Sequence, residues 1–208
     1  MILRSNWKVL AMSLVLVLSL GLLPMAESEA VSPFAQTTDD DWPMLAHDLK
    51  RSGRSPIEVM PPYTIKWVRD FYSADNEISE IVFAEYQPIV VRGLVYVGTS
   101  RNNMYALDSD TGGIVWKYNA DDAGGEIMSS PAVSDGVLYF GSTDGYLYAL
   151  DAQTGAFRWK VGLDFGEFRS SPAVVDGKVL IGATNGTFYA FSTANGSVVW
   201  EYETDGCL

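Results

Sequence analysis

Short apolar runs separated by turn signals cover the chain from about residue 86 onward. In the middle of the chain these runs are Pro131–Val133, Val137–Phe140, Tyr146–Leu150 and Phe157–Val161. Asp135-Gly136, Asp144-Gly145 and Thr154-Gly155 lie between them. Asp-Gly between apolar runs is a strong hairpin signal, because a tight turn needs positive φ and glycine adopts it at little cost. We therefore predict four short strands joined by hairpins.

The same pattern recurs with a spacing of 43 and then 41 residues. Four kinds of marker keep this spacing: Pro88, Pro131 and Pro172; Gly98, Gly141 and Gly182; Gly112, Gly155 and Gly196; Trp116, Trp159 and Trp200. The third unit repeats the turn signals at Asp176-Gly177, Asn185-Gly186 and Asn195-Gly196, whereas the first has Arg92-Gly93 and Ser100–Asn103. Markers that share one register predict three repeat units, at about 86–119, 129–162 and 170–203.

The second strand of each unit is apolar at successive positions, as Val95–Gly98, Leu138–Gly141 and Val179–Gly182. A strand of this kind is covered on both faces. Stacked four-stranded sheets provide such cover, and repeats of about forty residues with four strands are typical of propeller blades. The sequence therefore predicts an all-β β-propeller with three blades present.

An eleven-residue motif, A-x-D-x-x-T-G-x-x-x-W, runs from the third strand to the fourth. It resembles the tryptophan-docking motif of pyrroloquinoline-quinone-like propellers, and the resemblance covers about residues 42–208. The matching residues are Ala106, Asp108, Thr111, Gly112 and Trp116 in the first copy, Ala149, Asp151, Thr154, Gly155 and Trp159 in the second, and Ala190, Gly196 and Trp200 in the third. The third copy has Ser192 in place of Asp and Asn195 in place of Thr.

We interpret this motif as structural. Asp108 and Asp151 can accept hydrogen bonds from turn amides, and the glycine takes a conformation that other residues resist. The alanine leaves room for an indole. The resemblance implies that each tryptophan packs onto the motif of the neighbouring blade, the alternative being that Trp116, Trp159 and Trp200 stack on a ligand.

The resemblance also implies seven or eight blades in the closed propeller, so the three present are an incomplete set. Ser129 follows Trp116 by 13 residues and Ser170 follows Trp159 by 11, so the next repeat is expected to start beyond Leu208. We expect a fragment or a truncated gene product. Assembly of a propeller from several chains is the alternative.

Residues 31–62 are expected to form a lead-in or linker before the propeller at 63–208. Asp41–Met44 and the stretch from His47 to Gly53 look like the lead-in of exported members of the family. The run Asp39–Asp41 is expected to be a solvated linker. Trp67 lies in a segment that looks like a lone outer strand, which in closed propellers completes the last blade.

Residues 1–30 have the pattern of an export signal. Arg4 and Lys8 precede the uncharged stretch Val9–Leu23, Pro24 ends it, and Ser28-Glu29-Ala30 offers a cleavage site before Val31. The alternative is an uncleaved membrane anchor. We therefore expect a periplasmic, cell-surface or secreted protein, without membrane insertion of the mature chain if the signal is cleaved. A lipoprotein signal would need a cysteine after the apolar run, and the sole cysteine is Cys207.

Charge and composition point away from several functions. The net charge is −12, which disfavours nucleic acid as a partner. The sole histidine, His47, cannot assemble a zinc site or a Ser-His-Asp triad, and no phosphate-binding loop occurs. We therefore expect no catalytic, metal-binding or cofactor-binding residues, and no cofactor.

The first hypothesis is a noncatalytic extracytoplasmic propeller that binds a protein or a cell-envelope component, similar to the propeller subunit of the bacterial outer-membrane assembly machinery. Its binding loops would be Asp121–Met128 and Leu163–Arg169. The alternatives are a fragment of a quinone-dependent quinoprotein dehydrogenase and the extracellular sensor domain of a larger protein. Asn185 and Asn195 lie in glycosylation sequons as well as in predicted turns.

Overall fold

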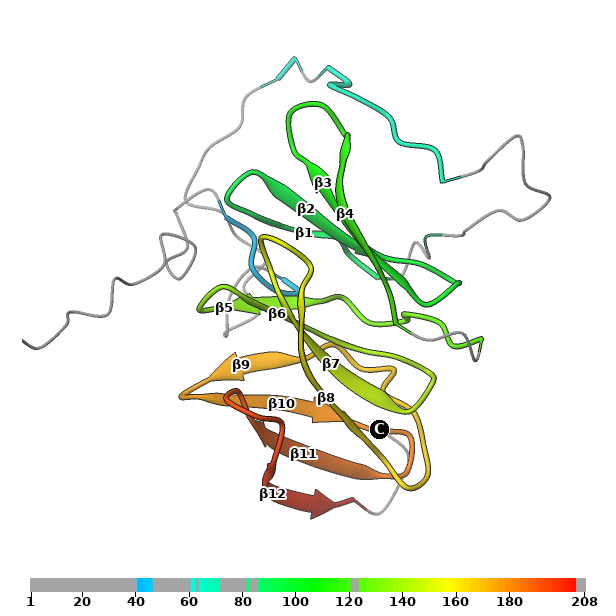
Figure 1. Ribbon diagram of the computed structural model, residues 1–208, viewed down its shortest axis with the longest axis vertical. Helices are drawn as coiled ribbons and strands as arrows, with labels where there is room; N and C mark the ends of the chain where they lie inside the picture. Colours follow the sequence, from blue (N-terminus) through cyan, green and yellow to red (C-terminus); the bar gives the residue numbers. More distant parts are fainter. Residues whose placement is uncertain are drawn as a thin grey trace, which may run out of the picture. The chain divides into compact units, whose positions relative to one another are not determined.

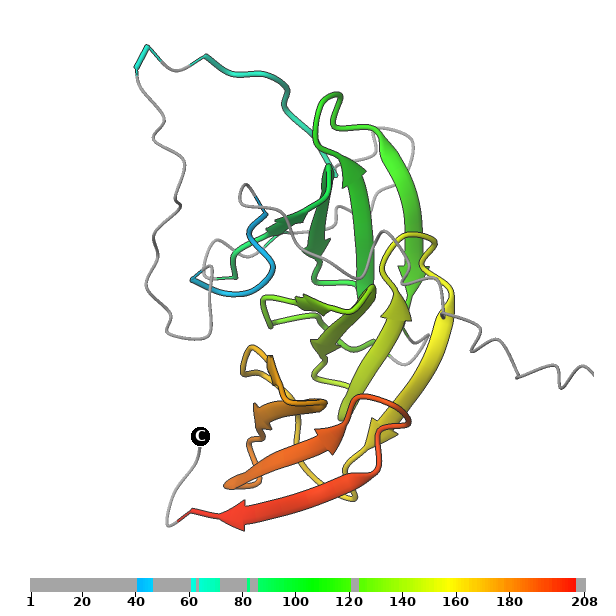
Figure 2. The same ribbon diagram turned by 90° about the vertical axis from the view of Figure 1, so that its left-hand side faces the viewer.

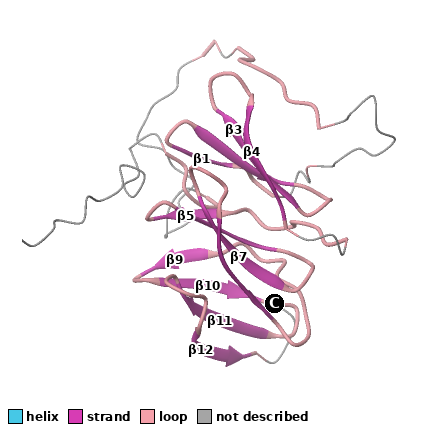
Figure 3. Ribbon diagram, viewed as in Figure 1, coloured by secondary structure: helices cyan, strands magenta, loops and turns pink. Residues whose placement is uncertain are grey.

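The computed structural model describes residues 41–46, 61–62, 64–71, 82, 86–120 and 124–204 (Figure 1). The predicted signal at 1–30, His47 and Cys207 lie outside these ranges, as do residues 121–123 of the first predicted binding loop. Strands are the regular elements of the described ranges (Figure 3), which hold no helix long and apolar enough to cross a membrane.

The described strands form three four-stranded antiparallel sheets. The first contains β1 (Ile89–Val91), β2 (Leu94–Gly98), β3 (Asn103–Asp108) and β4 (Ile114–Asn119). The second contains β5 (Ala132–Ser134), β6 (Val137–Gly141), β7 (Tyr146–Asp151) and β8 (Phe157–Gly162). The third contains β9 (Ala173–Val175), β10 (Lys178–Gly182), β11 (Thr187–Ser192) and β12 (Val198–Glu203). Strand order follows sequence order in each sheet, which confirms the predicted all-β fold of four-stranded propeller blades.

The hairpin turns are of two kinds. Between β5 and β6, Asp135 and Gly136 both have positive φ (51° and 73°), the geometry of a two-residue hairpin turn. Between β6 and β7, Gly145 has positive φ and donates its N–H to the Ser142 carbonyl at 3.3 Å. Asp144 contributes there through its side chain, which accepts the Tyr146 N–H at 2.9 Å. The two Asp-Gly pairs therefore make different turns, because the second lies at the end of a longer loop.

Two apolar cores hold the three blades together, and Figures 1 and 2 both show the sheets following one another in chain order. Tyr96 and Trp116 of the first sheet pack against Leu138 and Phe140 of the second. On its opposite face the second sheet packs against the third. All five residues of β6 are buried, so the cover on both faces that we predicted for this strand is confirmed.

The lead-in residues contact the inner strands of two blades. Trp42 forms a bridge with Val90, and the Pro43 carbonyl accepts the Val133 N–H at 2.8 Å. Met44 lies in the core between the second and third sheets. Asp41 is 4% exposed and accepts the Arg92 N–H at 2.6 Å. The expectation of a solvated linker is therefore wrong at Asp41, because its carboxylate caps the β1–β2 turn.

Candidate functional site: the tryptophan-docking network and a groove between blades

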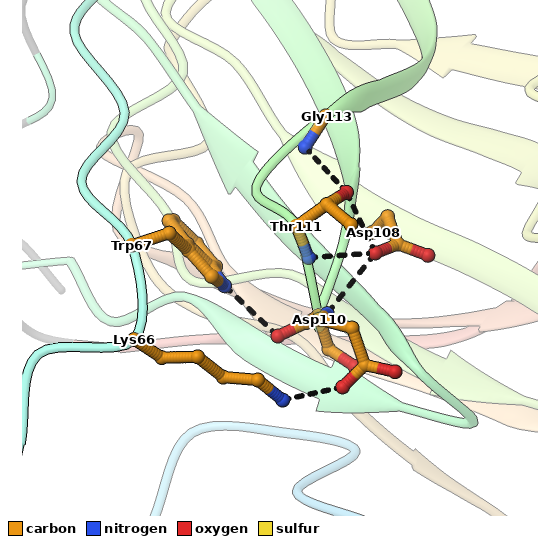
Figure 4. A network of polar contacts seen from close by, with 7 residues as sticks. Lys66, Trp67, Asp108, Asp110, Thr111 and Gly113 are labelled. Carbon is orange, nitrogen blue, oxygen red and sulfur yellow. Dashed lines mark hydrogen bonds and ion pairs between the residues drawn. The ribbon is translucent and has the colours of Figure 1, made fainter.

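The acidic residue of the repeated motif organises the turn that follows the third strand. Asp108 Oδ1 accepts hydrogen bonds from the Thr111 N–H and hydroxyl, both at 2.8 Å, and from the Asp110 N–H at 3.1 Å (Figure 4). The Thr111 hydroxyl oxygen in turn accepts the Gly113 N–H at 3.2 Å. The hydrogen bonds from Thr111 hold the pKa of Asp108 below its usual value.

The second and third copies make the same turn with different residues. Asp151 accepts from the Thr154 N–H and hydroxyl at 3.0 and 2.9 Å, and it pairs with Arg158 at 2.8 Å. Partial burial raises the pKa of Asp151, but the bonds from Arg158 and Thr154 outweigh it and the net pKa is lowered. In the third copy, Asn195 Oδ1 accepts the Ser197 N–H at 3.0 Å. The motif departures at 192 and 195 thus preserve a side-chain-supported turn.

Each of three tryptophans donates its indole N–H to the motif of the next sheet. Trp116 reaches the Ala152 carbonyl and Trp159 the Thr193 carbonyl, both at 3.0 Å. Trp67 reaches the Ser109 carbonyl of the first sheet at 2.9 Å (Figure 4). The structure therefore repeats one contact three times, each time one sheet further along.

The motif glycines lie directly under these indoles. A Cβ atom at Gly112, Gly155 or Gly196 would come within 2.7 Å of the ring of Trp67, Trp116 or Trp159, respectively. The same glycines have φ of +69° to +72°, a region that residues with a side chain rarely adopt. Glycine is thus required both by the backbone and by the tryptophan above it.

The motif alanines serve their own sheet. Ala106 pairs with Trp116, Ala149 with Trp159 and Ala190 with Trp200, and a register shift follows the alanine each time. All three alanines are fully buried. A larger side chain there would meet the indole on the neighbouring strand.

Trp200 differs from its counterparts. It is 41% exposed, whereas Trp116 is 9% exposed, and it contacts Phe188 of its own sheet with ring centroids 6.0 Å apart. Among the described residues, no further motif lies beyond it to accept its indole N–H.

Trp67 differs in another way. Its segment, residues 64–71, belongs to none of the described strands, so the expectation of an outer strand is not met there. The segment contacts the first sheet through side chains, including an ion pair between Lys66 and Asp110, and Ile65 and Val68 point to solvent. Its tryptophan nonetheless occupies the docking site of that sheet.

Two polar networks between blades were not predicted. In the first, the Gln87 N–H donates to the Ser130 hydroxyl at 2.8 Å, and the Ser130 N–H donates to the Ser171 hydroxyl at 2.9 Å. Each serine thus receives a backbone donor from the preceding blade. The spacing of 41 residues between Ser130 and Ser171 was the available signal.

The second network surrounds the buried Asn102. Its amide donates to Asp144 at 2.8 Å, and its carbonyl oxygen accepts the Ser142 hydroxyl at 2.8 Å. The Tyr148 hydroxyl donates to the same Asp144 carboxylate at 2.6 Å. Asn102 has φ of 55° and stands at the repeat position of Gly145, so alignment of the repeats could have indicated its special conformation.

The predicted binding loop Leu163–Arg169 borders a groove between the second and third blades. Phe168 is fully buried and contacts the Gly141 backbone, whereas Phe165 is 75% exposed. The groove has a volume of about 310 Å³ and is lined by Asp164, Phe165, Asn185, Tyr189, Glu201 and Glu203, among others. The Asn185 amide, part of a sequon, donates to the Tyr189 hydroxyl at 2.9 Å.

The first predicted binding loop is described from Gly124 onward. Ile127 is buried under the first sheet beside Gly98, and the Glu126 N–H donates to the Thr143 hydroxyl at 2.8 Å. Within the described ranges, no three His, Cys, Asp or Glu side chains gather closely enough to hold a metal ion.

The chain is similar to proteins of two kinds. A family model described as outer membrane protein assembly factor BamB matches residues 65–160 and, in a second match, 100–207. The crystal structure of BamB from Moraxella catarrhalis is 26% identical with a TM-score of 0.52, covering 62% of this chain and 38% of that one. No curated protein matches the chain.

Two solved enzymes share the fold. Quinohemoprotein alcohol dehydrogenase from Comamonas testosteroni is 24% identical (TM-score 0.59; 83% of this chain, 28% of that one). Quinohemoprotein alcohol dehydrogenase ADHIIG from Pseudomonas putida HK5 is also 24% identical (TM-score 0.59; 79% and 26%). The chain thus spans between 26% and 38% of the length of these three proteins.

The matched residues include all three sheets and the three copies of the docking motif. The chain therefore belongs to the pyrroloquinoline-quinone-like β-propeller repeat family, whose matching model is described as outer membrane protein assembly factor BamB.

Proposed function

We propose that this chain is a noncatalytic, extracytoplasmic propeller module that binds another protein or a cell-envelope component. The match to the family model described as an outer-membrane assembly factor supports this function, as does the likeness to BamB from Moraxella catarrhalis. The apolar pattern of residues 1–30 supports export.

The exposed side chain of Phe165 is the observation that carries the proposal. It lies on a loop held in place on both sides, by buried Phe168 and by the bond from the Glu167 N–H to the Thr184 hydroxyl at 2.9 Å. A large aromatic side chain presented on a fixed backbone beside a groove is typical of a protein-binding anchor. The docking tryptophans Trp116 and Trp159 are bonded to the neighbouring blade and do not face a ligand.

Crosslinking tests this role. A photoreactive amino acid at position 165 of the full chain, expressed in its own host, should give a discrete adduct with an envelope protein. The control places the same group at Lys178, on the exposed β9–β10 hairpin far along the sheet from the groove. Adducts at both positions alike, or at neither, would contradict the proposal.

Export is tested separately by N-terminal sequencing of the protein recovered from the host. Cleavage after Ala30 gives a chain that starts at Val31. A protein that keeps Met1 and sediments with membranes supports the anchor instead.

The quinoprotein alternative rests on the two alcohol dehydrogenases, whose identity to this chain shows the fold alone. Pyrroloquinoline quinone with Ca²⁺ should leave the tryptophan fluorescence unchanged apart from the inner-filter effect. Saturable quenching would instead support a dehydrogenase fragment.

A further inference from the structure

The outer faces of the first and third sheets are the two halves of one repeated interface. We propose that the β9–β12 face of one copy of this chain docks onto the β1–β4 face of a second copy. Trp200 then takes the site that Trp67 of the second copy occupies in the structure. This inference does not depend on the proposed function.

The first half of the interface is the outer face of the third sheet. Its repeat positions in the first two sheets are buried, at Tyr96, Trp116 and Tyr139 for example. In the third sheet, Leu180 and Phe188 are only half-buried, and Tyr202 is 67% exposed beside Trp200. An apolar sheet face with this composition is normally covered.

The second half is the outer face of the first sheet. At the same repeat positions in the second sheet, Leu138, Phe140, Tyr148 and Leu150 are fully buried beneath the first. In the first sheet, Val97, Tyr105 and Leu107 are covered by the side chains of Trp67 and Phe71. This cover is incomplete, because an apolar groove of about 390 Å³ remains between Val95, Val97, Leu107 and the 64–71 segment.

The tryptophan contact supplies the register. Each docked indole uses a carbonyl acceptor and a positive-φ glycine, which the first sheet offers at Ser109 and Gly112. Trp67 holds this site from a segment outside the described strands, whereas Trp200 comes from the paired strand β12. A whole sheet brings more apolar cover than the segment, so displacement of Trp67 by Trp200 is favoured.

The contact is head-to-tail, because two different faces meet. Such an interface forms either a closed ring or an open filament. Two copies that close on each other place twice the three described sheets around one axis, within the range of about four to eight blades known for propellers. We therefore expect a closed dimer.

Sedimentation velocity over a concentration series tests the proposal on the full chain. The wild type should shift from monomer to dimer, and Trp200→Ala should weaken the dimer at least tenfold. Trp67→Ala should strengthen it, because it empties the site. Phe165→Ala, at an exposed aromatic outside both faces, is the matched control and should leave the association unchanged. Equal association of the Trp200→Ala variant, or weaker association of Trp67→Ala, would overturn the proposal.

A mixing experiment keeps the test independent of folding defects in one variant. Trp200→Ala copies retain the docking site, and Gly112→Ala copies retain the Trp200 face but block the site. Neither should self-associate, and the mixture should form one-to-one pairs. A mixture that stays monomeric overturns the proposal. So does a wild type that remains monomeric while Trp200 becomes protected only after further repeats are fused after residue 208, which would assign the face to a blade of the same polypeptide.

Discussion

The indole N–H of Trp116 lies 3.0 Å from the carbonyl oxygen of Ala152, and the ring of Trp116 covers Gly155 three residues further on. One side chain thus contacts the neighbouring sheet by a directional bond and by its whole aromatic face. The next blade along repeats this arrangement with Trp159 and Gly196. The cohesion of the stack therefore depends on a few large residues at known positions.

Replacement of Trp116 should be among the most destabilising single changes. Trp116→Ala removes a buried indole and its hydrogen bond, so we expect a loss of about 3–5 kcal/mol in the free energy of unfolding. Trp200→Ala, measured at a dilution where the chain is monomeric, should cost less than half as much, because its side chain is 41% exposed. Urea titration followed by circular dichroism measures both, and equal losses would contradict the docking interpretation.

Gly155→Ala should be destabilising for two separable reasons. The new Cβ would lie 2.7 Å from the Trp116 ring, and φ is +71°. Gly124→Ala is the control, because Gly124 has φ of +86° with nothing within 4 Å of the new atom. We expect about 1–2 kcal/mol for the control, from backbone strain alone. Gly155→Ala should cost about 1–3 kcal/mol more, from overpacking. Thermal denaturation of both variants gives the difference, and equal costs would mean that the indole moves away freely.

Ser171→Ala should loosen the contact between the second and third blades. It leaves the Ser130 N–H without its hydroxyl acceptor, which costs about 1–3 kcal/mol if the amide stays dry. Hydrogen exchange should show faster exchange at the Ser130 amide than in the wild type. Ser197→Ala, at an exposed turn position, is the control and should leave both the stability and that amide unchanged.

The carboxylate of Asp151 should make stability depend on acid pH. Its pKa is lower in the folded protein than its ordinary value of 3.8. Its contribution is therefore fully present above that value, and it is lost as the pH falls through the folded pKa. Asp151→Asn should be less stable by about 1 kcal/mol at neutral pH. The two proteins should converge below about pH 3. A stability difference that persists in acid would show that the charge is not responsible.

Tyr139 should affect stability at alkaline pH. Burial raises the pKa of this hydroxyl to about 12, from its ordinary value of 10.0. The folded state thus favours the neutral phenol, so the contribution is complete below pH 10 and is lost as the pH rises toward 12. Tyr139→Phe should fall less steeply in stability over that window. Urea titrations across this pH range check it, and parallel pH profiles would contradict the assignment.

The repeat spacing was enough to predict the blades, because glycine turns and the motif are local signals that each unit carries in full. Local signals also explain why Asp135-Gly136 forms the expected turn. The β6–β7 turn depends on a longer loop in which Ser142 and Asp144 both take part. Dipeptide patterns alone do not distinguish these two cases.

Other features depend on contacts between segments far apart in the sequence. The burial of Asp41 follows from the place of the lead-in beside Val90 and Arg92, which no local pattern encodes. The hydrogen bonds of Asn102 and Ser130 with the next blade depend in the same way on how two units meet. Trp67 was recognised by its surroundings in sequence, but whether its segment pairs as a strand depends on a partner strand.

The buried Ile127 and Phe168 divide each connecting loop into a variable part and a fixed part. From Ser129 to Trp159 and from Ser170 to Trp200 the chain has the same length, so the two-residue difference between repeats lies in the loops. Both anchors enclose the backbone of the preceding sheet, at Gly98 and Gly141. Extra residues inserted upstream of an anchor would therefore lengthen the loop without shifting either sheet. The fold can accordingly accept grafted peptides at these two places, and a family built on it can diversify its recognition surface while the stack is inherited intact.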